Sequence, residues 1–208
     1  ESLRKLNKTI YKFKSSFEFD VFPDLIKKEK LYGYKSLKFN HDYGTINRLN
    51  NRNEIIQNNQ IKWLFLDRDS TLNHDYSSYT HKISDLKRIN IIDPILKGYQ
   101  DNGYHLCVIT NQSGIARGFY SEKDLENFNN ELSKQLQKVG INLQLFLYCP
   151  HMPDSRCNCR KPKTGLLDYV DELFGIDLKN SIFIGDSDSD ILCASNFKIS
   201  SLKLNLIN

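Results

Sequence analysis

Three of the five cysteines in this 208-residue chain lie close to a histidine, in the pattern C-x-H-x5-C-x-C. Three thiolates and one imidazole are a common ligand set for structural zinc, whereas a catalytic zinc leaves one coordination position open. Reduced free thiols or a redox pair are the alternative interpretation. The stretch has prolines and no hydrophobic run, which suits a loop folded around a metal ion. The pattern predicts a structural zinc loop made by Cys149, His151, Cys157 and Cys159.

Two carboxylates, Asp67 and Asp69, follow the short apolar run IKWLFL. Such a run is typical of a buried parallel strand, and residues i and i+2 past its end can face one crevice. Taken alone, the pair is equally compatible with a surface turn, because Asp is common in turns. Three further polar groups strengthen the prediction of a phosphate site: Thr110 with Asn111, Arg160 with Lys161, and Gly185 with Asp186 and Asp190.

Strands alternate with helices from residue 61 onward. The expected strands are 61–67, 104–110, 143–149 and 181–186, with 201–205 as a further candidate. Asp93, Ser121 and Thr164 are expected to cap helices, with Asp124 completing a capping box with Ser121, and a further helix is expected to begin at Ser187. This alternation predicts an α/β fold with a three-layer, doubly wound parallel sheet. The ligand crevice of such a sheet lies outside the carboxyl ends of its strands, where the polar groups fall.

The motif D-x-D-x-T, a strand-end Thr, a Lys and G-D-x-x-x-D occur in that order, and residues 61–205 thereby resemble the haloacid dehalogenase (HAD) superfamily. More narrowly, DRDSTLN, VITNQSGIARGFY, YCPHMPDSRCNCRKPKTG and IGDSDSDI resemble the subgroup of histidinol-phosphate phosphatases and D-glycero-D-manno-heptose 1,7-bisphosphate 7-phosphatases. The resemblance implies a HAD-like, Rossmann-type phosphatase domain, which we expect over residues 59–208.

The mechanism of that family implies a role for each matching residue. Asp67 is expected to attack phosphorus, while Asp69 protonates the leaving alkoxide and then deprotonates water. Mg²⁺ is expected to bind Asp67, the backbone carbonyl of Asp69, and Asp186. Thr110 and Lys161 are expected to ligate the transferring phosphoryl group. Contacts to the rest of the substrate are expected from Asn111, Gln112, Ser113 and Arg160.

Two positions depart from the pattern of the subgroup. Ser70 stands where D-x-D-G-T has Gly, so a turn with positive φ would be strained there and activity reduced. Ser187 replaces a Lys or Arg that often follows the G-D pair, which removes one candidate contact to a second phosphate. The expected substrate is a phosphosugar, with heptose 1,7-bisphosphate cleaved at the 7-phosphate ahead of histidinol phosphate. A zinc-stabilised binding module with a decayed phosphatase site is the alternative from another class.

Residues 1–58 are rich in aromatic side chains but show no closed set of strands. The stretch 17–49 resembles the closing part of a sugar-phosphate nucleotidyltransferase, with a variant of its D-I-G-T-P motif at 42–45, but the Gly-rich nucleotide loop is missing. We expect this segment to be a remnant appended to the phosphatase. Because the only methionine is Met152, we also expect a parent protein in which a nucleotidyltransferase domain comes first.

The formal net charge of +4 is small and dispersed, and no block of Lys and Arg stands beside an aromatic ladder. We therefore expect no nucleic-acid partner. No apolar run approaches the roughly 20 residues of a membrane span, and the amino end has no hydrophobic signal core. We therefore expect a cytoplasmic protein that does not contact membranes.

Overall fold

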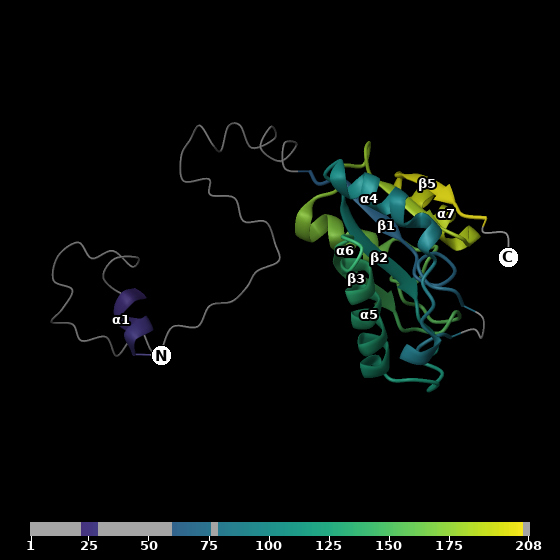
Figure 1. Ribbon diagram of the computed structural model, residues 1–208, viewed down its shortest axis with the longest axis horizontal. Coiled ribbons are helices and arrows are strands. Elements are labelled where there is room, and N and C mark those ends of the chain that lie inside the picture. The colour runs from purple at the N-terminus through teal and green to yellow at the C-terminus, as the bar shows by residue number, and fades with distance from the viewer. Residues whose placement is uncertain (1–21, 29–59, 76–78, 206–208) are drawn as a thin grey trace. The chain divides into compact units, whose positions relative to one another are not determined.

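A computed structural model describes residues 22–28, 60–75 and 79–205 of the chain (Figure 1). In the amino-terminal part it describes one short helix, α1 (Phe22–Lys27). The predicted origin of residues 1–58, and the predicted domain boundary at residue 58, fall mostly outside the described residues and stay predictions.

Five parallel strands form one sheet in the order β3-β2-β1-β4-β5. They are β1 (Trp63–Leu66), β2 (His105–Asn111), β3 (Leu143–Cys149), β4 (Ile182–Gly185) and β5 (Ser200–Lys203). All four residues of the central strand β1 are buried, as expected for a strand covered on both faces. The predicted strands are confirmed, with ends shifted by one or two residues.

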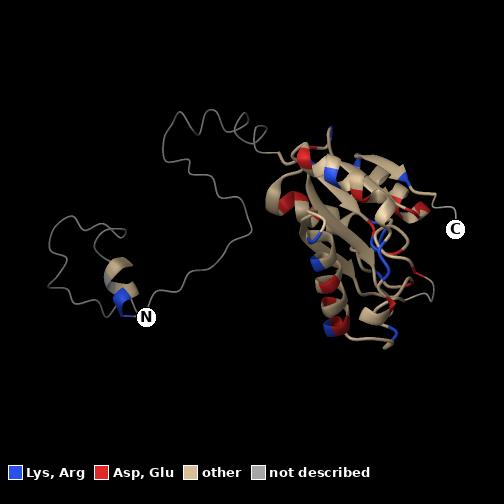
Figure 2. Cartoon of the chain, viewed as in Figure 1, with Lys and Arg blue, Asp and Glu red and all other residues tan. Residues whose placement is uncertain are grey.

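Helices cover both faces of the sheet. On one face, α4 (Asp93–Asp101) and α5 (Glu122–Gln137) pack against one hydrophobic cluster. On the other, α6 (Gly165–Phe174) and α7 (Asp188–Phe197) pack against a second cluster. Short 3-10 turns, η3 (Ile83–Asp85) and η4 (Asn90–Ile92), precede α4. The predicted three-layer α/β architecture is therefore confirmed. Charged residues of both signs occur along α5 (Figure 2).

The helix caps follow the sequence prediction at two of three positions. Ser121 caps α5 in a capping box with Asp124. The helix expected to begin at Ser187 begins one residue later, with Ser187 as its N-cap. Thr164 is the N-cap of α6, although its side chain bonds to Asp168 and not to the backbone. The prediction for Asp93 is wrong: Ile92 is the N-cap, and the carboxylate of Asp93 instead pairs with Arg88. The reason is that the η4 turn runs directly into α4.

The strand order reverses direction beside β1. The chain adds β2 and β3 on one side of β1 and then returns to place β4 on the other side. The carboxyl ends of β1 and β4 therefore lie together, and the backbone N–H of Asp67 donates to the carbonyl of Ile184 at 3.0 Å. Such a reversal point is where doubly wound sheets bind ligands.

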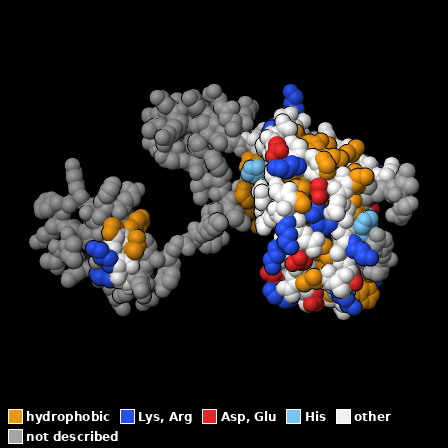
Figure 3. Space-filling model, in the orientation of Figure 1, with side chains coloured by type: hydrophobic (Ala, Val, Ile, Leu, Met, Phe, Trp, Pro, Cys, Tyr) orange, Lys and Arg blue, Asp and Glu red, His pale blue; other side chains and the backbone are white. Residues whose placement is uncertain are grey.

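Within the described ranges, every helix is too short or too polar to cross a bilayer. On the face seen in Figure 3, Lys and Arg side chains are interspersed with acidic, polar and apolar ones. The dispersed charge expected from the sequence is thus visible on this face.

Candidate active site

A pocket of about 320 Å³ lies at the carboxyl ends of the strands. All nine residues predicted for catalysis, magnesium binding and substrate binding line it: Asp67, Asp69, Thr110, Asn111, Gln112, Ser113, Arg160, Lys161 and Asp186. These residues come from four separate segments of the chain, so only the parallel sheet brings them together. Asp75 and Tyr79, on the loop after Asp69, also line the pocket.

A buried ion-pair network occupies the floor of the pocket. The Lys161 ammonium lies 2.6 Å from Asp67 Oδ1 and 2.6 Å from Asp190 Oδ1, and it donates to the carbonyl of Ile109 at 2.7 Å. Asp190 is fully buried, and Gly185 leaves room for it, because a Cβ there would collide with its carboxylate. Asp190 also accepts from Ser187 N and Oγ through Oδ2, at 3.0 and 2.7 Å.

Two carboxyl groups of the pocket, Asp67 and Asp186, resist ionisation. Burial raises the pKa of Asp67 from 3.8 to about 7, with Lys161 opposing the shift and Asp190 and Asp69 adding to it. Burial likewise raises the pKa of Asp186, with Asp190 adding to it. Burial works to lower the pKa of Lys161, but its ion pairs with Asp67 and Asp190 outweigh that effect and raise it. A cation bound between the carboxylates would stabilise their charged forms.

We expect the protein without Mg²⁺ to lose stability as pH rises from about 4 to about 7. Over that range the folded chain keeps a proton on Asp67 that the unfolded chain releases, so raising the pH favours unfolding. Thermal unfolding between pH 4.5 and 7.5 in Mg²⁺-free buffer checks this. Asp67→Asn lacks the titration and should show a shallower fall, so parallel profiles for the two proteins would contradict the prediction.

Three carboxylates could share one metal ion. Oxygen atoms of Asp67, Asp186 and Asp190 all lie within 4.8 Å of one another. Hard oxygen ligands of this kind suit Mg²⁺. Asp190 is fully buried and does not line the pocket, whereas Asp67 and Asp186 do, so Asp67 and Asp186 are the side chains best placed to ligate a cation. This choice matches the two side-chain ligands predicted from the sequence.

Two residues expected to contact substrate also hold the site together. The side chain of Asn111 bonds both to the carbonyl and to the N–H of Lys161, at 3.2 and 3.1 Å. Gln112 is buried and its amide donates to Asp69 and Thr110. Arg68, which contacts Asp69, was not predicted, because the variable position of D-x-D carries no signal of its own.

Ser70 lies in the left-handed region with φ of 56°. A non-Gly residue there costs about 1–2 kcal/mol. The strain predicted from the sequence depended on a positive φ at this position, and Ser70 has one.

We expect Ser70→Gly to raise turnover by up to about fivefold, the factor that corresponds to about 1 kcal/mol. Its stability should change little, because the released strain is offset by the greater freedom of Gly in the unfolded chain. Phosphate release by wild type and variant on the same phosphosugars measures this. Lys198→Gly is a matched control, since Lys198 also has positive φ, 65°, but ends α7 outside the pocket. A fall in rate on every substrate would instead mean that the serine hydroxyl assists catalysis.

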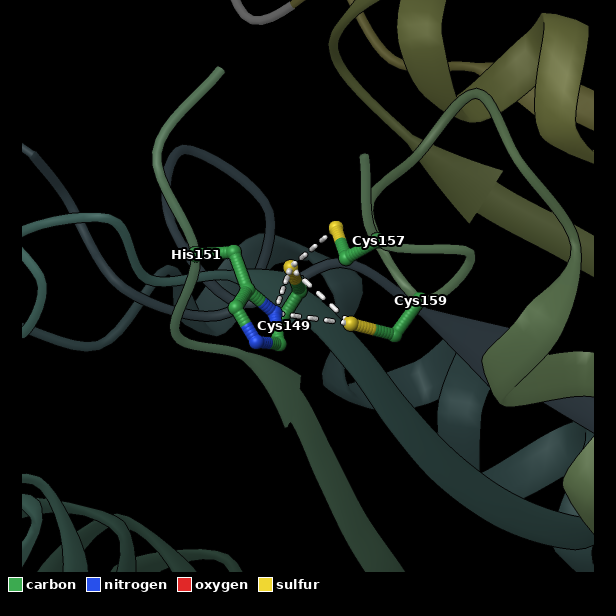
Figure 4. Close-up of side chains that lie close together, drawn as sticks. All are labelled: Cys149, His151, Cys157 and Cys159. Carbon is green, nitrogen blue, oxygen red and sulfur yellow. Dashed lines mark hydrogen bonds between the residues drawn. The ribbon is translucent and has the colours of Figure 1, made fainter. Parts of the chain in front are cut away.

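The predicted zinc ligands converge after the end of β3 (Figure 4). Cys149 Sγ lies 3.8 Å from Cys157 Sγ, 3.2 Å from Cys159 Sγ and 3.6 Å from His151 Nδ1. Tetrahedral zinc with Zn–S bonds of about 2.3 Å separates its sulfur ligands by about 3.8 Å, so the group is close to the required size. Burial raises the pKa of Cys149 to about 12, whereas a hydrogen bond from Ser155 is the main cause that lowers the pKa of Cys157 to about 6.

The loop that carries the predicted zinc ligands, residues 149–159, is tied to the pocket by hydrogen bonds to backbone carbonyls. Arg160 Nη1 donates to the carbonyl of His151 at 3.4 Å, and the N–H of Lys163 donates to the carbonyl of Arg160 at 2.9 Å. Gly165 N donates to the carbonyl of Asn158 at 3.0 Å, and a Cβ on Gly165 would collide with that carbonyl. The loop therefore sets the position of the segment that carries Lys161.

Comparisons with known proteins agree on one family for this chain. Residues 49–201 match the polynucleotide kinase 3 phosphatase family. The D-glycero-alpha-D-manno-heptose-1,7-bisphosphate 7-phosphatase of Campylobacter jejuni is 41% identical over 145 residues, 70% of this chain and 83% of that protein. The corresponding Photorhabdus laumondii enzyme is 39% identical over 143 residues, 65% of this chain and 78% of that protein.

A solved structure agrees with these sequence matches. The D,D-heptose 1,7-bisphosphate phosphatase from B. bronchiseptica, crystallised with magnesium and phosphate, superposes with a TM-score of 0.64 at 26% identity, over 68% of this chain and 79% of that one. The chain thus belongs to the polynucleotide kinase 3 phosphatase family of HAD-like phosphatases, in the group that includes the heptose bisphosphate 7-phosphatases.

Proposed function

We propose that this chain hydrolyses the 7-phosphate of D-glycero-D-manno-heptose 1,7-bisphosphate, with Mg²⁺ as cofactor and an aspartyl-phosphate intermediate. The observation that carries the proposal is the contact of Asp67 with Lys161 on the floor of a pocket that Asp69, Thr110 and Asp186 also line. The substrate is inferred from the names of the relatives and the magnesium from the complex of the B. bronchiseptica enzyme.

In the first step, a carboxylate oxygen of Asp67 attacks phosphorus and the bond to the sugar oxygen breaks, while Asp69 gives that oxygen a proton. In the second step, Asp69 takes a proton from water as the water oxygen attacks phosphorus, which releases phosphate and frees Asp67. The charge of Lys161 balances negative charge on the phosphoryl oxygens, and the Thr110 hydroxyl donates a hydrogen bond to them. Mg²⁺, held by Asp67, Asp186 and the Asp69 carbonyl, would screen the repulsion between nucleophile and substrate.

Structural zinc is the second proposed cofactor, and Cys149, His151, Cys157 and Cys159 would hold it. Its chemistry would be that of a closed, four-ligand structural site. A cytoplasmic location stays a prediction.

Phosphate release with a substrate panel tests the proposal. The panel contains heptose 1,7-bisphosphate, heptose 7-phosphate, histidinol phosphate and a DNA oligonucleotide with a 3′-phosphate, each with Mg²⁺ or with chelator. We expect kcat/KM to be highest for heptose 1,7-bisphosphate and to vanish without Mg²⁺. A preference for histidinol phosphate or for the 3′-phosphate would replace the proposed substrate, whereas no release from any of the four would overturn the phosphatase assignment.

A further inference from the structure

The fully buried side chain of Arg68 is anchored to the carboxylate of Asp69. Arg68 Nε donates to Asp69 Oδ1 and Nη2 donates to Oδ2, each at 2.8 Å. Two parallel N–H···O bonds of this kind fix the orientation of a carboxylate as well as attract it. Because the Asp69 side chain is 20% exposed at the edge of the pocket, the pair places a carboxylate at a defined position where substrate can reach it.

The guanidinium is itself held by groups from three other segments. Its remaining donors bond to the carbonyl of Thr80 at 2.7 Å, to Gln112 Oε1 at 3.2 Å and to Asn129 Oδ1 at 3.3 Å. Its carbon lies 4.7 Å from the centre of the Phe128 ring. A buried guanidinium with all these partners has one orientation, which it passes on to Asp69.

Gln112 supports the same carboxylate from the other side. Its Oε1 accepts from Tyr120 Oη at 2.5 Å as well as from Arg68, so its Nε2 is directed towards Asp69 Oδ2, 2.9 Å away, and Thr110 Oγ1, 3.0 Å away. The two donors of Tyr120 and Arg68 therefore determine which way the amide points.

We propose that Arg68 is the positioning residue for proton transfer by Asp69, acting through its two-pronged hydrogen bond. This inference rests on the proposed function, in which the Asp69 proton goes to the departing sugar oxygen and returns from the attacking water. Arg68 does not line the pocket and acts on the reaction only through the carboxylate of Asp69, so its contribution is the geometry of that carboxylate.

A comparison of two substrates with different leaving groups distinguishes this role from a merely structural one. A sugar alkoxide needs a proton to depart, whereas 4-nitrophenolate departs without one. In single-turnover assays with Mg²⁺, we expect Arg68→Gln to slow enzyme phosphorylation by heptose 1,7-bisphosphate about 100-fold. Phosphorylation by 4-nitrophenyl phosphate should stay within about threefold of wild type. Because the second step still needs Asp69 as a base, phosphoenzyme should accumulate in the variant with the nitrophenyl substrate.

The double variant Arg68→Gln/Asp69→Asn makes the test specific. If Arg68 acts through Asp69, the double variant should be slower than Asp69→Asn by less than about threefold. Arg88→Gln is the matched control, because it removes another Arg–Asp ion pair, in which Arg88 Nη2 contacts both carboxylate oxygens of Asp93 at the start of α4, without touching the pocket. It should lower stability and leave both phosphorylation rates unchanged.

Two outcomes would overturn the proposal, and a third would refute the proposed function on which it rests. Equal slowing by Arg68→Gln on both substrates, or a full additional loss in the Asp69→Asn background, would overturn it. Should Arg68→Gln not fold, Arg68→Lys keeps the charge but loses the fork, and the same leaving-group dependence is expected and the same results would overturn it. Failure of the wild type to form any phosphoenzyme would instead refute the proposed function.

Discussion

Asp67→Asn is expected to lower Mg²⁺-dependent phosphate release by at least about 10⁴-fold while leaving the fold intact. An amide is not a nucleophile, so the aspartyl-phosphate cannot form. The fold should survive because the folded chain already disfavours the charge of Asp67, whose pKa burial raises to about 7, and because Lys161 keeps its contact with Asp190. Turnover, the unfolding temperature at pH 7, and phosphoenzyme after acid quench are the measurements.

Asp188→Asn is the matched control for this change. Asp188 is an exposed carboxylate whose ion pair with Lys203, at 2.6 Å, lies outside the pocket. It should keep wild-type turnover. Intact mass must show that the amide introduced by Asp67→Asn has not deamidated back to the carboxylate. Full turnover by verified Asp67→Asn would contradict the assigned nucleophile.

Loss of the zinc ion proposed for the loop of residues 149–159 is expected to have the second largest effect on stability and activity. Wild-type protein should contain about one zinc per chain, and His151→Ala should lose it, unfold about 10 °C lower and turn over more slowly even with saturating Mg²⁺. The activity should fall because the contacts from His151, Cys157 and Asn158 to residues 160–165 position Lys161.

His151→Cys tests whether ligation and not the imidazole itself matters. Four thiolates are also a common structural zinc set, so this variant should keep its zinc and most of its stability and activity. Elemental analysis, thermal unfolding and phosphate release cover both variants. Wild-type protein that is free of metal, with a stability that chelators do not change, would contradict the zinc prediction.

Local sequence patterns predicted the place of some pocket residues but not the hydrogen bonds of others. Asp67, Thr110 and Asp186 could be placed together from sequence because each lies at the carboxyl end of an apolar strand, and parallel strands end at one edge of a sheet. The hydrogen bonds by which Asn111 and Gln112 hold the site together could not be predicted in the same way. A motif gives the type of a side chain near the site, but its hydrogen-bond partners depend on rotamers that long-range packing selects.

The sequence by itself determined the order of strands and helices, the acids at the strand ends and the four residues proposed to bind zinc. These features depend on residue type and short spacing, which local physics links directly to structure. The tertiary structure alone decided that Lys161 meets Asp67 from 94 positions away, that Arg68 is buried against Asp69, and that Ser70 has positive φ. Each of these depends on segments distant in sequence packing around one point, and burial, ion pairing and backbone strain arise only from that packing.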